Sequence, residues 1–261
     1  MIRKAFAGSA ALLLALVTAL VMMVVPAAAA APTECIGTLP VGTYDNVVVP
    51  SGAHCEMLPG TTVTGNVLVR ADASLRASGS TISGHVIGRD VSWVCVQFGS
   101  DVGGNFDVTG GDVGTTTGFD IFVEVGGNAK VSENAGLTFI DAAQVGGNID
   151  VSENTGTLEI EHNTVGGNVK IADNIVPVGY TGGPTTPGPG GCGIPSSLFG
   201  GGGMSVLNNT AANSNMHVIM NSGPGFKQVV QNTVKNLVCL NNDPVFVGGP
   251  NNEQHAVGQC F

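Results

Sequence analysis

The sequence V-G-G-N-I-D-V-S-E-N, residues 145–154, is the clearest indication of the fold because the chain repeats it. Other copies, two of them close and three weaker, start at Val125, Val165, Val63, Ile82 and Val102. After a break, the pattern recurs once more in Thr233–Asn242. Self-similarity at a period of about 20 residues indicates a solenoid, in which each repeat packs only against its neighbours.

Apolar residues alternate within each copy, as Ile149 and Val151 do, which is the period of a strand. A second short strand is expected in several copies, at Thr138–Ile140 and Leu158–Ile160. About twenty residues suit one coil of a three-sided helix of short strands. The Gly-Gly pairs are expected to provide positive φ where the coil bends, and Asn tolerates the same region.

Stacked coils place equivalent residues in columns. One predicted inward column contains Val67, Val86, Phe106, Ala129, Ile149, Val169 and Leu237. A second column, with stacked amides, contains Asn66, Asn105, Asn128, Asn148, Asn168 and Asn236. One outward column alternates in charge through Asp107, Lys130, Asp150 and Lys170. Opposite charges on neighbouring strands favour this register.

The V-G-G-N coils resemble the parallel β-helix of pectate-lyase-like secreted proteins and autotransporter passenger domains. The stretch Thr62–Asp90 is also similar to the short coils of bactofilin-type polymer-forming proteins, which are usually cytoplasmic and lack disulfides. The Cys-rich start and the closing V-G-Q-C are similar to secreted bacterial proteins of right-handed β-helix type. These resemblances imply an all-β, right-handed parallel β-helix with disulfide-closed ends. They imply no activity, because a fold by itself does not define one.

Residues 1–31 are predicted to be a cleaved secretory signal peptide. Arg3 and Lys4 precede the apolar run Ala10–Val25, which is shorter than the roughly 20 residues that span a bilayer. Cleavage would remove Arg3 and Lys4, two of the nine basic residues. The mature chain would then contain seven Lys and Arg and 19 Asp and Glu, a net charge of −12. This charge disfavours nucleic acid and anionic membranes as partners. The sequence therefore predicts a protein that is secreted or on the cell surface, with a glycan or extracellular protein as its partner.

An even number of cysteines in an exported chain indicates disulfides. Local closure pairs Cys35 with Cys55 and Cys239 with Cys260, and leaves Cys95 and Cys192 to pair with each other. The predicted organisation is an N-terminal disulfide cap at 32–61, coils at 62–174, a Gly/Pro-rich loop at 175–203, and final coils with a C-terminal disulfide cap at 204–261.

No catalytic constellation is recognised, and no cofactor is expected other than calcium as a candidate ion. His85 is interpreted as a turn residue in an Asn position, and Arg89 with Asp90 as a surface ion pair. One acidic column, Glu133, Glu153 and Asp173, suggests a calcium site, because calcium prefers carboxylate oxygens. Asn134, Asn154 and Asn174 adjoin this column and are expected to offer further oxygens. The alternative is an ordinary solvated surface.

Three function classes remain open. A non-catalytic structural, adhesion or glycan-binding protein is favoured. The second class is a carbohydrate-active enzyme, either a polysaccharide lyase or a glycoside hydrolase. Such an enzyme requires carboxylates that converge with aromatic side chains in a groove. The chain has one Trp and two Tyr, which are few for the aromatic surfaces on which sugars stack. A self-assembling matrix protein is the third class, and the sequence leaves the oligomeric state open.

Overall fold

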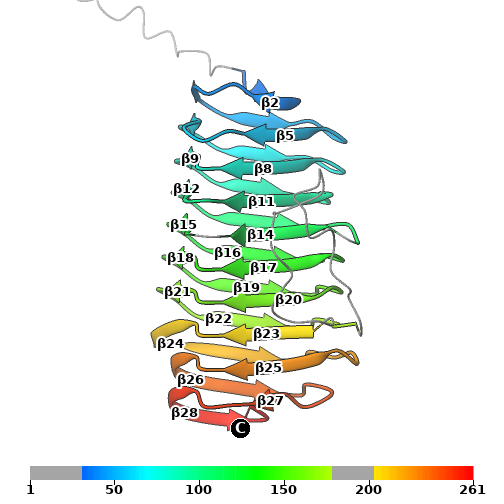
Figure 1. Cartoon of the computed structure of the whole chain (residues 1–261), viewed down its shortest axis with the longest axis vertical. Coiled ribbons are helices and arrows are strands. Elements are labelled where there is room, and N and C mark those ends of the chain that lie inside the picture. The colour runs from blue at the N-terminus through cyan, green and yellow to red at the C-terminus, as the bar shows by residue number, and fades with distance from the viewer. Residues whose placement is uncertain (1–30, 114, 121, 178–202, 261) are drawn as a thin grey trace, which may run out of the picture. The chain divides into compact units, whose positions relative to one another are not determined.

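A computed structural model of the chain describes residues 31–113, 115–120, 122–177 and 203–260. From Pro32 onward the described residues form a parallel β-solenoid, in which coils follow one another from β2 to β28 (Figure 1). The described residues contain no helix. The predicted signal peptide and most of the Gly/Pro-rich loop lie outside the described residues, so these two assignments stay predictions.

Each coil has three faces, and every strand pairing is parallel. Face 1 contains β1 Thr33–Glu34, β4 Val47–Val49, β7 Val67–Val69, β10 Val86–Gly88, β13 Phe106–Thr109, β16 Ala129–Ser132, β19 Ile149–Ser152 and β22 Val169–Ala172. Face 2 is a ten-stranded sheet of β2 Gly37–Leu39, β5 His54–Met57, β8 Ser74–Ser78, β11 Trp93–Gln97, β14 Thr116–Asp120, β17 Leu137–Asp141, β20 Leu158–Glu161, β23 Gly203–Leu207, β25 Phe226–Val230 and β27 Val247–Gly248. Face 3 contains the two-residue strands β3 Thr43–Tyr44, β6 Thr62–Val63, β9 Thr81–Ile82, β12 Asp101–Val102, β15 Glu124–Val125, β18 Gln144–Val145 and β21 Thr164–Val165. In the last coils β24 Thr210–Ile219, β26 Thr233–Leu240 and β28 Asn252–Gly258 run across faces 3 and 1.

The predicted register is confirmed on face 1. Ile149 pairs with Ala129 on one side and with Val169 on the other, and all three side chains are buried. The predicted inward column is continuous, and Met216 completes it in the coil that the sequence pattern missed. That coil escaped detection because extra residues between Ala211 and Asn215 shift its register.

The predicted Asn column is confirmed on the surface between faces 3 and 1. The side-chain oxygens of Asn66, Asn105, Asn128, Asn148 and Asn168 each accept the backbone N–H of the next column residue, as Asn128 Oδ1 does from Asn148 N at 2.8 Å. In the last coils Asn215 Oδ1 accepts instead from Asn236 Nδ2. His85 belongs to this column, because its Nδ1 accepts the N–H of Asn105 at 2.8 Å. The imidazole therefore replaces an asparagine amide, which refines its interpretation as a turn residue.

The side chains of two further Asn columns point into the solenoid, and the sequence did not predict them. The first contains Asn134, Asn154, Asn174, Asn221 and Asn242, and the second Asn163, Asn209, Asn232 and Asn251. All but Asn251 are buried. These amides accept backbone N–H groups that would otherwise be buried without a partner at the corners of the coil.

The glycines of V-G-G-N are required by close packing, so the expectation that they provide positive φ was wrong. Neither Gly146 nor Gly147 has a positive φ. A Cβ on Gly146 would lie 2.4 Å from the carbonyl oxygen of Gly126, and one on Gly147 would lie 2.5 Å from Asn128 Oδ1. Positive φ is instead adopted at other corners by residues with side chains, such as Glu153 at 60° and His162 at 57°.

Disulfides join Cys35 to Cys55 and Cys239 to Cys260, as the local-closure argument predicted. Cys95 is also disulfide-bonded. Its predicted partner, Cys192, lies outside the described residues, so that pairing stays a prediction for non-reducing peptide mapping.

The outward charged column on face 1 has the predicted order, and Lys170 Nζ lies 3.6 Å from Asp150 Oδ1. The expected pairing of Arg89 with Asp90 was wrong. Arg89 forms its ion pair with Asp107 in the next coil, because Asp90 occupies a corner at φ 52°.

Candidate functional site

The acidic column Glu133, Glu153 and Asp173 lies at a corner of the solenoid. All three residues are exposed and adopt positive φ, between 58° and 60°. Among the described residues, no group of three or more Asp, Glu, His or Cys side chains is arranged to hold a metal ion. Calcium binding by this column stays a prediction.

The expectation that neighbouring asparagines add oxygens to this column was wrong. Asn134, Asn154 and Asn174 are fully buried. Asn154 Oδ1 accepts the N–H of Asn134, and its Nδ2 donates to Asn174 Oδ1, both at 2.9 Å. The amides are therefore occupied inside the solenoid and cannot reach an ion on the surface.

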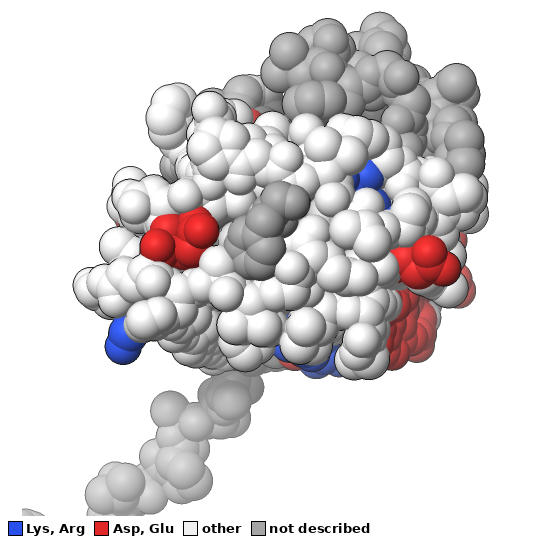
Figure 2. All heavy atoms as spheres, turned by 90° about the horizontal axis from the view of Figure 1, so that it is seen from below, with Lys and Arg blue, Asp and Glu red and all other residues white. Residues whose placement is uncertain are grey.

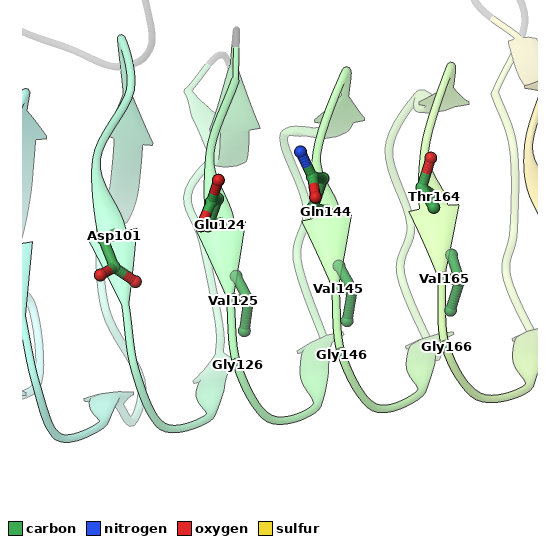
Figure 3. A pocket seen from close by; sticks show the side chains of 10 residues that line it. All are labelled: Asp101, Glu124, Val125, Gly126, Gln144, Val145, Gly146, Thr164, Val165 and Gly166. Carbon is green, nitrogen blue, oxygen red and sulfur yellow. The ribbon is translucent and has the colours of Figure 1, made fainter.

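A groove with a volume of about 390 Å³ crosses face 3 over β12, β15, β18 and β21. A row of four outward polar side chains, one from each successive coil, lines this groove (Figure 3). The four residues are Asp101, Glu124, Gln144 and Thr164. All four are exposed. Two carboxylates, an amide and a hydroxyl therefore follow one another along the axis at about 4.8 Å per coil.

The apolar lining of the groove comes from valines and glycines. Val125, Val145 and Val165 are buried beneath it. The residue that follows each of these valines also points outward and is a glycine, as at Gly146. The column of glycines therefore leaves a strip of the surface without side chains. Since a side chain on Gly146 would strike the neighbouring coil, coil packing by itself accounts for the hollow.

A second cluster of carboxyl groups lies on the outer side of face 2. Asp141 at the end of β17 pairs in register with Glu161 at the end of β20, and Glu159 lies two residues earlier on β20. His162 follows at the corner, where its Nδ1 lies 2.9 Å from Asp141 Oδ1 and its Nε2 lies 3.3 Å from Asn208 Nδ2. The neutral ring with Nδ1–H satisfies both contacts, since it donates to Asp141 and accepts from Asn208.

Burial perturbs this cluster. It raises the pKa of Glu159 to about 7, and the neighbouring carboxylates Glu161 and Asp141 add to the increase. Burial also raises the pKa of Glu161, against the hydrogen bond from Ser205. Carboxyl groups with such shifts are candidates for functional sites.

These residues were not among those predicted from the sequence. The signal was present, because L-E-I-E at 158–161 alternates in the manner of a strand and Asp141 precedes Glu161 by one repeat. The strongly repeated V-G-G-N pattern covers only the first strand of each coil, whereas these residues lie on the second strand, whose sequence varies more from coil to coil.

No family model matches this chain, and neither a curated protein nor a solved structure matches it.

Within the described residues, no helix has the length and hydrophobicity needed to cross a bilayer. Seen end-on from the C-terminal coils, much of the surface comes from uncharged residues, and acidic side chains gather towards the sides (Figure 2). The fold is therefore a parallel β-solenoid, and its acidic side chains lie in the row on face 3, in the cluster on face 2 and in the corner column of Glu133, Glu153 and Asp173.

Proposed function

We propose that this chain is a non-catalytic exported protein that binds an extended polymer, most simply a glycan strand, along the groove of face 3. The observation that carries the proposal is the row of exposed hydrogen-bonding groups on successive coils, from Asp101 to Thr164. A polymer of repeating sugars presents hydroxyl groups in the same periodic manner. Carboxylates, amides and hydroxyls both orient and select such groups.

The charge and the resemblance support the same role. The mature chain is expected to carry a net charge of −12, so a neutral or cationic polymer fits better than an anionic one. The likeness of the V-G-G-N coils to secreted bacterial β-helix proteins favours export, and the disulfides are compatible with an oxidising compartment.

A glycan array probed with the purified mature protein tests this proposal. The double variant Glu124→Ala, Gln144→Ala removes the centre of the polar row, and Glu133→Gln is the matched control at an exposed corner outside the groove. We expect the double variant to lose binding and the control to keep it. Binding that survives the double substitution would refute the groove. Concentration-dependent sedimentation without glycan binding would instead favour a self-assembling protein.

A further inference from the structure

The polar row of face 3 continues beyond the groove in both directions. Strand pairing keeps one register along this face, so Thr81 pairs with Asp101 before the groove and Thr210 pairs with Thr164 after it. The full row comprises Thr43, Thr62, Thr81, Asp101, Glu124, Gln144, Thr164, Thr210, Thr233 and Asn252. Each of these side chains is exposed or half-buried. Face 3 therefore presents one hydrogen-bonding side chain in each described coil, at a spacing of about 4.8 Å.

Two exposed phenylalanines lie at the corner that leads into this row. Phe98 comes shortly before β12 and Phe122 shortly before β15, the two strands that carry the carboxylates of the row. Phe98 is 49% exposed and Phe122 is 74% exposed, and both adopt positive φ, at 54° and 58°. A positive φ is uncommon for a bulky residue, and the same corner is occupied by Ala142 and His162 in the next two coils. Folding by itself therefore does not account for two exposed aromatic rings beside the polar row.

We propose that the ligand of face 3 is a straight, unbranched and neutral polysaccharide of β-1,4-linked pyranoses, bound lengthwise with about one sugar per coil. This inference rests on the proposed glycan-binding function. Equatorial linkages extend such a chain as a ribbon, and one of its sugars is about as long as the spacing between coils. An α-1,4-linked chain winds into a helix, so it would contact few coils at once. Successive sugars of the ribbon face opposite ways, which suits threonine hydroxyls because they both donate and accept.

Charge and aromatic contacts favour neutral sugars. Asp101 and Glu124 are exposed carboxylates in the middle of the row, and none of the described residues of the row is basic. The row would therefore repel the carboxylates of an acidic polysaccharide. The apolar face of a pyranose packs against an aromatic ring, and Phe98 and Phe122 offer two such rings on adjacent coils.

The length of the ligand distinguishes this inference from a site confined to the groove. The groove spans four coils, from Asp101 to Thr164, so a tetrasaccharide would fill it. Contacts with Thr81 and Thr210 require a longer chain. Isothermal titration of the mature protein compares tetramers and hexamers of β-1,4-linked glucose and of β-1,4-linked N-acetylglucosamine. In at least one series we expect the hexamer to bind at least about fivefold more tightly, since each added sugar contributes a hydrogen bond.

Threonine variants test the two extensions of the row. The double variant Thr81→Val, Thr210→Val keeps the branched shape of both side chains but removes their hydroxyl groups. It should lower the affinity for the hexamer to that for the tetramer. Thr155→Val is the matched control, because Thr155 is exposed at a corner outside face 3. This control should leave the affinity unchanged.

The aromatic corner is tested in the same titration. The double variant Phe98→Ala, Phe122→Ala should weaken binding of the hexamer about tenfold. Phe226→Ala is the control, since Phe226 is 52% exposed but lies on β25 of face 2. Two further hexamers test the class of sugar: α-1,4-linked glucose and β-1,4-linked mannuronate should each bind at least about fivefold more weakly than the best neutral β-linked hexamer.

The outcomes separate this inference from the function on which it rests. Equal affinities for tetramer and hexamer, unchanged affinity in either double variant, or equal binding of the α-linked or acidic hexamer would overturn the inference. Loss of binding in Glu124→Ala, Gln144→Ala would then still support a glycan site confined to the groove. If no hexamer binds and the glycan array is also negative, the glycan-binding function itself is refuted, and the inference with it.

Discussion

Replacing Asn154 by alanine tests whether the buried Asn columns stabilise the solenoid. The substitution removes the Oδ1 that accepts the N–H of Asn134 at 2.9 Å, in a place that water cannot reach. A buried donor without a partner costs about 1–3 kcal/mol. The vacated volume adds to this cost, so we expect a loss of about 2–4 kcal/mol in the free energy of unfolding.

Asn148→Ala is the matched control, because Asn148 makes the same kind of contact on the surface. Its Oδ1 accepts the N–H of Asn168 at 2.7 Å, but the residue is exposed and water can replace the amide. We expect a loss of about 1 kcal/mol or less. Urea unfolding with the disulfides intact measures both values.

Amide hydrogen exchange supplements the urea measurement, because long repeat arrays can unfold in steps. The amide of Asn134 should lose protection in Asn154→Ala but not in Asn148→Ala. Equal losses of stability in the two variants, within about 0.5 kcal/mol, would refute the argument that burial of the amide ladder matters.

Three further predictions concern packing, calcium and pH. Gly147→Ala should destabilise the fold by more than about 2 kcal/mol, because its Cβ would lie 2.5 Å from a side-chain oxygen of the neighbouring coil. In the control Gly42→Ala, the new Cβ would meet nothing closer than 3.5 Å, so this variant should be near neutral in the same unfolding assay. If the acidic column binds calcium, millimolar calcium should raise the melting temperature more than magnesium does, and Glu153→Gln should remove most of that shift; equal small effects of calcium, magnesium and added sodium chloride would end the idea. The pKa of Glu159 is raised to about 7, so its contribution to the free energy of unfolding is fully present below about pH 4.5 and is lost as pH rises through 7. Glu159→Gln should therefore flatten the decline in stability between pH 5 and pH 8. An unchanged pH profile would contradict this.

Much of the fold could be predicted because the V-G-G-N repeat aligns the coils in only one way. A shift of one residue would turn Ile149 outward and Asp150 inward, which fixes the register without any structure. The two confirmed disulfides follow equally from the sequence, since Cys35 and Cys55 lie one coil apart at separation 20. The coil around Met216 escaped because its inserted residues break the period.

The candidate sites depended more on the tertiary structure. The sequence brought Glu133, Glu153 and Asp173 together correctly as one exposed column. It could not show that the asparagines beside them point inward, because the direction of a corner side chain depends on which residue adopts positive φ.

The repeat, the parallel stacking and the predicted columns could be recognised from the amino-acid pattern alone, since they follow from a fixed period and from alternation along a strand. Which polar groups are buried and which are accessible depends on how the coils pack, and this became clear only from the three-dimensional structure. The raised pKa of Glu159 arises from burial and from the carboxylates of Glu161 and Asp141, and both depend on packing between neighbouring coils. Burial and charge proximity are properties of the assembled coils, and no single repeat contains them.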